Sequence, residues 1–266
     1  MPLALRHSVA LVAAFLVASC SLFGEVDETK GWSAQKLYAE AKLELDSGNY
    51  ENAIKLYQKI EARYPHGRFA QQAQLEIAYA YYKDEQPAEA IATAERFMKL
   101  HPNHPNVDYA YYLRGLCNFN GDLGWEGWIG GQDMSERDPK AAHDAFMAFK
   151  ELAARYPKSR YTPDAVARMK YLVNSLAEHE VHVARYYMKR GAYLAAANRA
   201  QFAVKTYPQA PATEEGLAIM VQAYGELEMW DLRNDAERVL MANFPKSPYR
   251  DGEAKKDVPW WQIWNR

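Results

Sequence analysis

Apolar and small residues recur at helical spacing from Trp32 onward, and an aromatic residue followed by proline interrupts this pattern at intervals. Positions three and four apart lie on one side of a helix, so the spacing predicts amphipathic helices rather than strands. Proline lacks a backbone N–H and clashes with the preceding turn, so each interruption predicts a helix end. The interruptions are Tyr64-Pro65, His101-Pro102, Tyr156-Pro157, Tyr207-Pro208 and Phe244-Pro245.

The residues before these prolines share one register. Alanine stands twelve positions before each of the first four prolines, and apolar residues stand eight and five positions before them. Alanine at a helix crossing lets two helices approach closely, and the next residues of the register fill the space beyond. The last copy is degenerate, because Arg233 and Glu237 take two of its places and only Leu240 matches. The matching sets are Ala53, Tyr57 and Ile60; Ala90, Ala94 and Phe97; Ala145, Phe149 and Leu152; and Ala196, Ala200 and Ala203.

This register resembles the tetratricopeptide repeat, a helix-turn-helix of about 34 residues. We expect five repeats over residues 33–245, and hence an all-α superhelical solenoid of about ten helices, with an unrelated helical bundle as the alternative. Successive prolines lie 37, 55, 51 and 37 residues apart, so two repeats carry extra chain. We expect an insertion at 120–138 in the third repeat and a lengthened first helix, 164–189 after Pro163, in the fourth.

The first nineteen residues have the form of a secretory signal, with a short basic start, an apolar run and small residues at the end. The run is about half as long as a membrane-spanning helix requires, so we expect residues 1–19 to be cleaved off. The residues ending at Cys20 resemble the bacterial lipobox, whose cysteine becomes an acylated N-terminus; an ordinary signal peptide is the alternative. Residues 20–32 would then be this lipid-bearing N-terminus and a short linker. Ser21, which is not aspartate, points in that resemblance to the outer membrane.

Composition narrows the classes of function. The chain has 266 residues, 49% of them hydrophobic, and a formal net charge of −2. It is therefore too apolar for a disordered protein and lacks the basic character of nucleic-acid binders, so we expect no nucleic-acid partner. Two cysteines, Cys20 and Cys117, exclude a disulfide framework, and Cys117 on an apolar stretch suits a small buried hydrophobe.

Motifs for catalysis are not found in the sequence. His179 and His182 are three positions apart around Glu180-Val181, which differs from the zinc-protease spacing, so we interpret this segment as a solvated helix face. No phosphate loop, nucleophile elbow or dinucleotide fingerprint occurs. We therefore expect a binding protein without cofactor or metal, and not an enzyme.

The whole chain, beyond its repeats, resembles the BamD (ComL) family, the lipoproteins of the machine that assembles outer-membrane β-barrels. The resemblance covers residues 20–250. The stretches that carry it are Leu37–Ala41, Ala78–Lys83, His101–Tyr109, Arg114–Leu116, Ser135–Pro139, Tyr186–Ala192 and Asn198–Arg199.

The resemblance implies a component of the BAM complex, held by lipid on the periplasmic side of the outer membrane. Such proteins receive unfolded outer-membrane proteins through their N-terminal repeats, here about 33–122. They dock the barrel subunit BamA through their C-terminal repeats, here about 162–245, alongside other barrel-assembly subunits. The alternative is a different periplasmic repeat lipoprotein that organises peptidoglycan enzymes or competence functions.

We expect the first helix of each repeat to line a concave face that binds peptides. In the first three repeats this face is unusually aromatic, and aromatic side chains give rigid, amphipathic contact area. Substrates of the family characteristically end in an aromatic residue with a free carboxylate, which Lys42 or Lys83 would pair with. About half of the tyrosines are expected to serve helix packing alone. The groove residues are Tyr38, Lys42, Tyr79, Tyr82, Tyr109, Tyr112 and Phe119.

The family resemblance places BamA docking on the segment from Tyr193 to Asn198 and Arg199. Arginine presents a rigid fork that suits a carboxylate. Tryptophans in the insertion and in the tail 246–266 are expected either to fold back on the solenoid or to contact a partner or the membrane. These are Trp125, Trp128, Trp260, Trp261 and Trp264.

Overall fold

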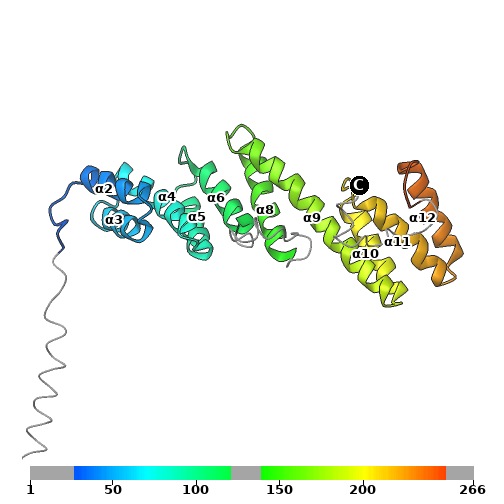
Figure 1. Ribbon diagram of the computed structural model, residues 1–266. Coiled ribbons are helices and arrows are strands. Elements are labelled where there is room, and N and C mark those ends of the chain that lie inside the picture. Colours follow the sequence, from blue (N-terminus) through cyan, green and yellow to red (C-terminus); the bar gives the residue numbers. More distant parts are fainter. Residues whose placement is uncertain (1–26, 121–138, 250–266) are drawn as a thin grey trace, which may run out of the picture.

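The computed structural model describes residues 27–120 and 139–249, which form ten α-helices and no strand (Figure 1). The helices follow one another as five pairs, which confirms the expected all-α solenoid of five repeats. The pairs are α2 (Ala34–Asp46) with α3 (Tyr50–Arg63), α4 (Arg68–Lys83) with α5 (Pro87–Leu100), α6 (Val107–Asn120) with α8 (Pro139–Arg155), α9 (Thr162–Lys189) with α10 (Tyr193–Thr206), and α11 (Thr213–Glu226) with α12 (Trp230–Asn243).

The pairs are laid out in a row, so the molecule is elongated (Figure 1). Each helix packs against the next one along the chain, and first helices of neighbouring repeats also meet, α2 with α4, α4 with α6 and α9 with α11. The first helices therefore adjoin one another along the molecule. Side chains from different repeats can share one surface there.

The register found in the sequence is the core of the solenoid. All members of the four matching sets, from Ala53 to Ala203, are fully buried at 0% exposure. In the degenerate fifth copy Leu240 is 1% exposed, whereas Arg233 and Glu237 remain partly exposed and form an ion pair. Each second helix ends two residues before its proline, as the sequence predicted.

All four turns between paired helices that the structure describes use a residue in the left-handed backbone region at the same place in the repeat. Gly48 and Gly191 have φ of 82° and 70°, and Glu85 and Glu228 have φ of 56° and 57°. Each lies seventeen positions before the proline of its repeat. Glycine adopts this conformation without the steric cost that glutamate bears, so two turns carry local strain.

The chain just before α2 is held against α3. The carboxylate of Asp27 accepts a hydrogen bond from Lys59 Nζ at 2.8 Å and pairs with the guanidinium of Arg63. The Tyr64 hydroxyl donates to the backbone oxygen of Trp32 at 2.7 Å. These contacts fix where the linker enters the first repeat. Within the two described ranges, no helix has the length and apolarity that crossing a bilayer requires.

Candidate functional site

A line of half-buried tyrosines runs along the first helices of repeats one to three and reaches the start of α9. We call it the tyrosine strip. Neighbouring rings pair within it, with centroids 6.4 Å apart for Tyr79 and Tyr82 and 5.3 Å apart for Tyr109 and Tyr161. The strip consists of Tyr38, Tyr79, Tyr82, Tyr109, Tyr112 and Tyr161.

Tyr38 begins the strip on α2. Its hydroxyl donates to Glu76 Oε1 at 3.2 Å, and its ring lies 5.5 Å from that of Phe69. Lys42, one turn further on, forms an ion pair with Asp46 at 3.1 Å. Lys42 is therefore at this end of the strip, as expected, but it already has a carboxylate partner.

The pKa values of three tyrosines of the strip, Tyr38, Tyr109 and Tyr112, are raised. Burial, and then the neighbouring Glu76 carboxylate, raise the pKa of Tyr38 far above its usual range. Burial, together with the surrounding phenols, does the same for Tyr109. Desolvation disfavours the charged form of an acid, so these hydroxyls remain protonated hydrogen-bond donors.

The far end of the strip joins α6 to α9. Tyr112 stacks on Tyr161 with centroids 4.8 Å apart and rings inclined by only 17°. The Tyr112 hydroxyl donates to Asp164 Oδ2 at 2.6 Å, and Arg168 Nε donates to the same oxygen at 2.6 Å. Burial, followed by the hydrogen bond to Asp164, raises the pKa of Tyr112 to about 12.

Phe119 differs from the other expected groove residues. It is 9% exposed and packs in the core cluster of repeats three and four, with its ring 6.2 Å from that of Phe149. The guanidinium of Arg168 lies 4.8 Å over the same ring. Phe119 therefore supports the strip from below instead of lining its surface.

Sequence reasoning missed four residues of this surface. Glu76 bonds Tyr38, and Tyr161, Asp164 and Arg168 complete the end on α9. Helical spacing of Glu76 with Tyr79 on one helix was a signal for the first of them. The other three precede or begin the long fourth-repeat helix, and only the packing of α9 beside α6 reveals their place.

The segment expected to dock BamA lies on α10. Arg199 is exposed, and its guanidinium Nη1 donates to Glu180 Oε2 of α9 at 3.0 Å. Asn198 beside it is exposed, and half-buried Tyr193 packs against the C-terminal core cluster. His182 is exposed and His179 is half-buried on α9, whereas Glu180 between them is 8% exposed. Val181 is buried as well.

The exposed side of α10 carries apolar residues at helical spacing. Leu194 and Phe202 are 57% and 48% exposed, and Asn198 lies between them at intervals of four residues. Residues four apart lie on one face of a helix, so these three form one stripe beside Arg199. Large apolar side chains in a row on a surface mark interaction sites.

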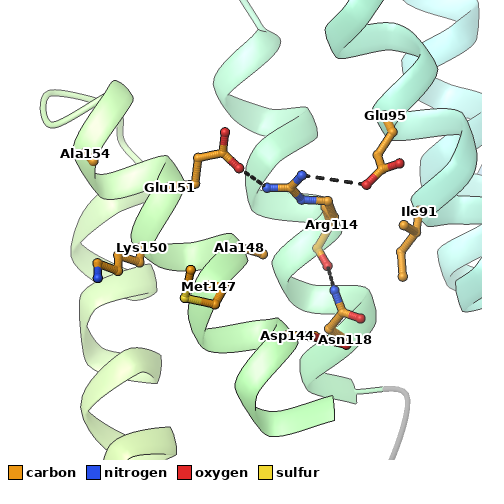
Figure 2. Close-up of a pocket in the computed structure, with 10 residues that line it drawn as sticks. All are labelled: Ile91, Glu95, Arg114, Asn118, Asp144, Met147, Ala148, Lys150, Glu151 and Ala154. Carbon is orange, nitrogen blue, oxygen red and sulfur yellow. Dashed lines mark hydrogen bonds and ion pairs between the residues drawn. The ribbon is translucent and has the colours of Figure 1, made fainter. Parts of the chain in front are cut away.

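A hollow in the third repeat lies between α5, α6 and α8 (Figure 2). It has a volume of about 580 Å³ and contains none of the residues predicted from the sequence. Arg114 from α6 reaches between Glu95 and Glu151, and Asn118 donates to the backbone oxygen of Arg114 at 3.1 Å (Figure 2). These ion pairs tie α5, α6 and α8 together.

The cysteines and the tryptophans singled out in the sequence lie away from these surfaces or outside the described residues. Cys117 is buried, and burial raises the pKa of its thiol to about 12, which suits an unreactive packing residue. Among the described residues, no group of three metal-ligating side chains comes together. Cys20 and the tryptophans Trp125, Trp128, Trp260, Trp261 and Trp264 lie outside the described residues.

Comparison with known proteins finds similarity to outer membrane lipoproteins. The YfiO family model, described as an outer membrane lipoprotein, matches residues 31–240. The outer membrane protein assembly factor BamD of Neisseria meningitidis serogroup B is 50% identical over 94% of this chain and 95% of its own length. BamD of Xylella fastidiosa is 36% identical over 95% of this chain and 86% of its own. The crystal structure of MamA matches 80% of this chain and 97% of its own at 17% identity, with a TM-score of 0.37.

Proposed function

We propose that this chain, which belongs to the YfiO family of outer membrane lipoproteins, is a lipid-anchored assembly factor that binds unfolded outer-membrane proteins and docks BamA. Its relatives along nearly the whole length carry the name outer membrane protein assembly factor BamD. The observation that carries the binding role is the tyrosine strip. It offers half-buried aromatic rings over three successive repeats, a form that suits an extended peptide.

Binding on such a surface is weak. Each aromatic contact contributes about 0.5 to 1.5 kcal/mol, and ordering a flexible peptide offsets much of the total. We expect micromolar affinity or weaker, about 8 kcal/mol or less. Weak binding suits a factor that has to release its substrate.

The C-terminal half has a different surface. The apolar stripe of α10, with Leu194 and Phe202 exposed and Arg199 beside it, supports docking of a folded partner. Arg199 uses one of its five N–H donors on Glu180, which leaves donors for a carboxylate of that partner. We propose that BamA docks here, within 162–245, and that peptide binding uses 33–122 together with the start of α9.

The strip is tested by replacing two of its tyrosines with alanine. Tyr79→Ala with Tyr82→Ala should weaken binding of a fluorescent peptide ending in Phe by about tenfold, because two aromatic contacts are lost. Tyr186→Ala is the matched control, since Tyr186 is 53% exposed on α9 and lies outside the strip. Fluorescence anisotropy measures the affinities, and circular dichroism confirms that the helices remain. Equal affinity of the double variant and the wild type would place peptide binding elsewhere.

A further inference from the structure

We infer that Arg168 binds the free C-terminal carboxylate of a peptide on the tyrosine strip, an inference that rests on the proposed function. Arg168 lies on α9 at the end of the strip, and it is not among the groove residues predicted from the sequence. The inference assigns a direction to the bound peptide. It also replaces Lys42 as the residue that recognises the chain end.

The guanidinium of Arg168 is held in place by three neighbours. Its Nε donates to Asp164 Oδ2 at 2.6 Å, its central carbon lies 4.8 Å from the centre of the Phe119 ring, and it also interacts with the Tyr112 hydroxyl. Its side chain is 29% exposed. An arginine carries five N–H donors in a planar fork, so the contacts with Asp164 and Tyr112 leave donors for a ligand. A planar fork held by these neighbours is suited to binding a carboxylate.

The aromatic surroundings suit the last side chain of such a peptide. Tyr112 and Tyr161 form a stacked pair next to Asp164, and Tyr171 of α9, which is 49% exposed, contacts Phe119 with centroids 6.0 Å apart. The half-buried Tyr112 and Tyr161 and the exposed Tyr171 therefore offer ring surface near Arg168 to a terminal aromatic ring. A carboxylate and an aromatic ring on the same residue would be recognised together.

The opposite end of the strip is less suited to a carboxylate. Lys42 pairs with Asp46, and the charge of Glu76 also acts on it. One ammonium group thus faces two carboxylates, which repel a further negative charge. Arg168 pairs with one carboxylate, Asp164. The balance of charge places the chain end at α9, with the peptide running back toward α4 and α2.

The experiment compares two peptides of identical sequence that end in Phe, one with a free carboxylate and one with a C-terminal amide. Wild-type protein should bind the free acid about tenfold more tightly, because a charge-assisted, bidentate contact is lost on amidation. Arg168→Gln should bind both peptides equally, at the affinity of the wild type for the amide. Arg168→Lys should retain part of the discrimination, because it keeps the charge without the fork. Lys170→Gln removes one exposed charge from another face of α9 and should discriminate like the wild type.

The outcomes separate this inference from the proposed function. If wild-type protein binds neither peptide, the strip is not a peptide site and both fail. If wild-type protein prefers the free acid and Arg168→Gln keeps that preference, the strip binds peptides but Arg168 does not recognise the chain end. Loss of the preference in Lys42→Gln instead would reverse the direction of the peptide and overturn the inference. Circular dichroism and thermal midpoints establish that Arg168→Gln is folded.

Discussion

Arg199 is proposed to contact a partner protein, and it also forms an ion pair with a buried carboxylate of its own chain. Any substitution therefore affects both roles, which have to be measured separately. Glu180 is largely buried, with 10% of its side chain exposed, and 48% of the Arg199 side chain is exposed. Truncation of Arg199 alone would leave this carboxylate unpaired at a cost of about 1 to 3 kcal/mol. Charge reversal would place two carboxylates together. Either variant would weaken the fold as well as any interface.

Replacing both members of this ion pair with glutamine separates the two roles. Glu180→Gln with Arg199→Gln removes the cation without stranding a charge, and we expect BamA to bind more than tenfold more weakly, since truncating one side of a desolvated charge pair costs about 2 to 5 kcal/mol. Glu180→Gln alone keeps Arg199 and is the matched control. Co-purification of BamA and the thermal midpoint are measured together. If the double variant co-purifies as much BamA as the wild type, the docking surface does not include Arg199.

The left-handed turn residues give a test of backbone strain. A Cβ added at Gly48 meets no atom within 4 Å, so Gly48→Ala should destabilise the protein through its backbone alone, by about 1 kcal/mol. Glu228→Gly should stabilise it by ~0.5 kcal/mol, because relief of strain exceeds the added entropy of the unfolded chain. Urea titration followed by circular dichroism measures both changes. Opposite signs are expected, and the same sign for both would refute the strain at these turns.

At the scale of the helices, the contact of α6 with α9 depends on a neutral tyrosine. The pKa of Tyr112 is raised to about 12 in the folded protein by burial and by Asp164, and it is about 10 when unfolded. Its contribution to stability is thus fully present below about pH 10 and is lost as the pH rises toward 12. We expect the thermal midpoint to fall over this range. In Tyr112→Phe the fall should be smaller, because the phenylalanine does not ionise, and an equal fall would contradict this assignment.

Helix ends and helix cores could be predicted from the sequence, because local rules decide them. Proline ends each second helix, and the alanine register buries itself wherever two helices cross. The tyrosines of α2, α4 and α6 were found in the same way, since their spacing along one helix sets the face they share. Phe119 was misplaced by this reasoning because its neighbours Phe149 and Arg168 come from other repeats.

Charged residues could not be assigned from spacing. Glu180 has polar histidine neighbours and the sequence gives no sign of burial, but the close approach of the alanine-rich α10 covers it. Arg168 resembles any surface arginine of a long helix until Phe119 and Asp164 are placed beside it. In both residues the decisive partner lies on a different helix. Their roles follow from packing between repeats.

On the scale of the whole molecule, the proposed lipid anchor would keep the elongated repeat row close to its membrane. Contacts of Asp27 with Lys59 and Arg63 fix the start of the first repeat, so a lipid on Cys20 would leave only a short stretch between bilayer and solenoid. We expect radiolabelled palmitate to enter the wild type and not Cys20→Ser, which should also leave the membrane fraction. Equal labelling of both proteins would exclude the anchor at Cys20.

The tyrosine strip extends from α2 to the start of α9, and the apolar stripe lies on α10, so the two surfaces approach each other only in the fourth repeat (Figure 1). A solenoid of this kind has few contacts between distant repeats, so substitutions in one half should leave the other folded. Peptide binding and partner docking are therefore separable by mutation. The strip variants should still bring down BamA, and the α10 variants should still bind peptide.

Co-purification from detergent-solubilised outer membranes tests whether this chain docks BamA. We expect affinity-tagged wild-type protein to bring down a large β-barrel protein that mass spectrometry identifies as BamA. The same preparation of the Glu180→Gln, Arg199→Gln double variant should lose most of it while keeping its helical circular dichroism. Recovery of peptidoglycan hydrolases without a barrel protein would contradict the assignment and indicate a cell-wall scaffold instead.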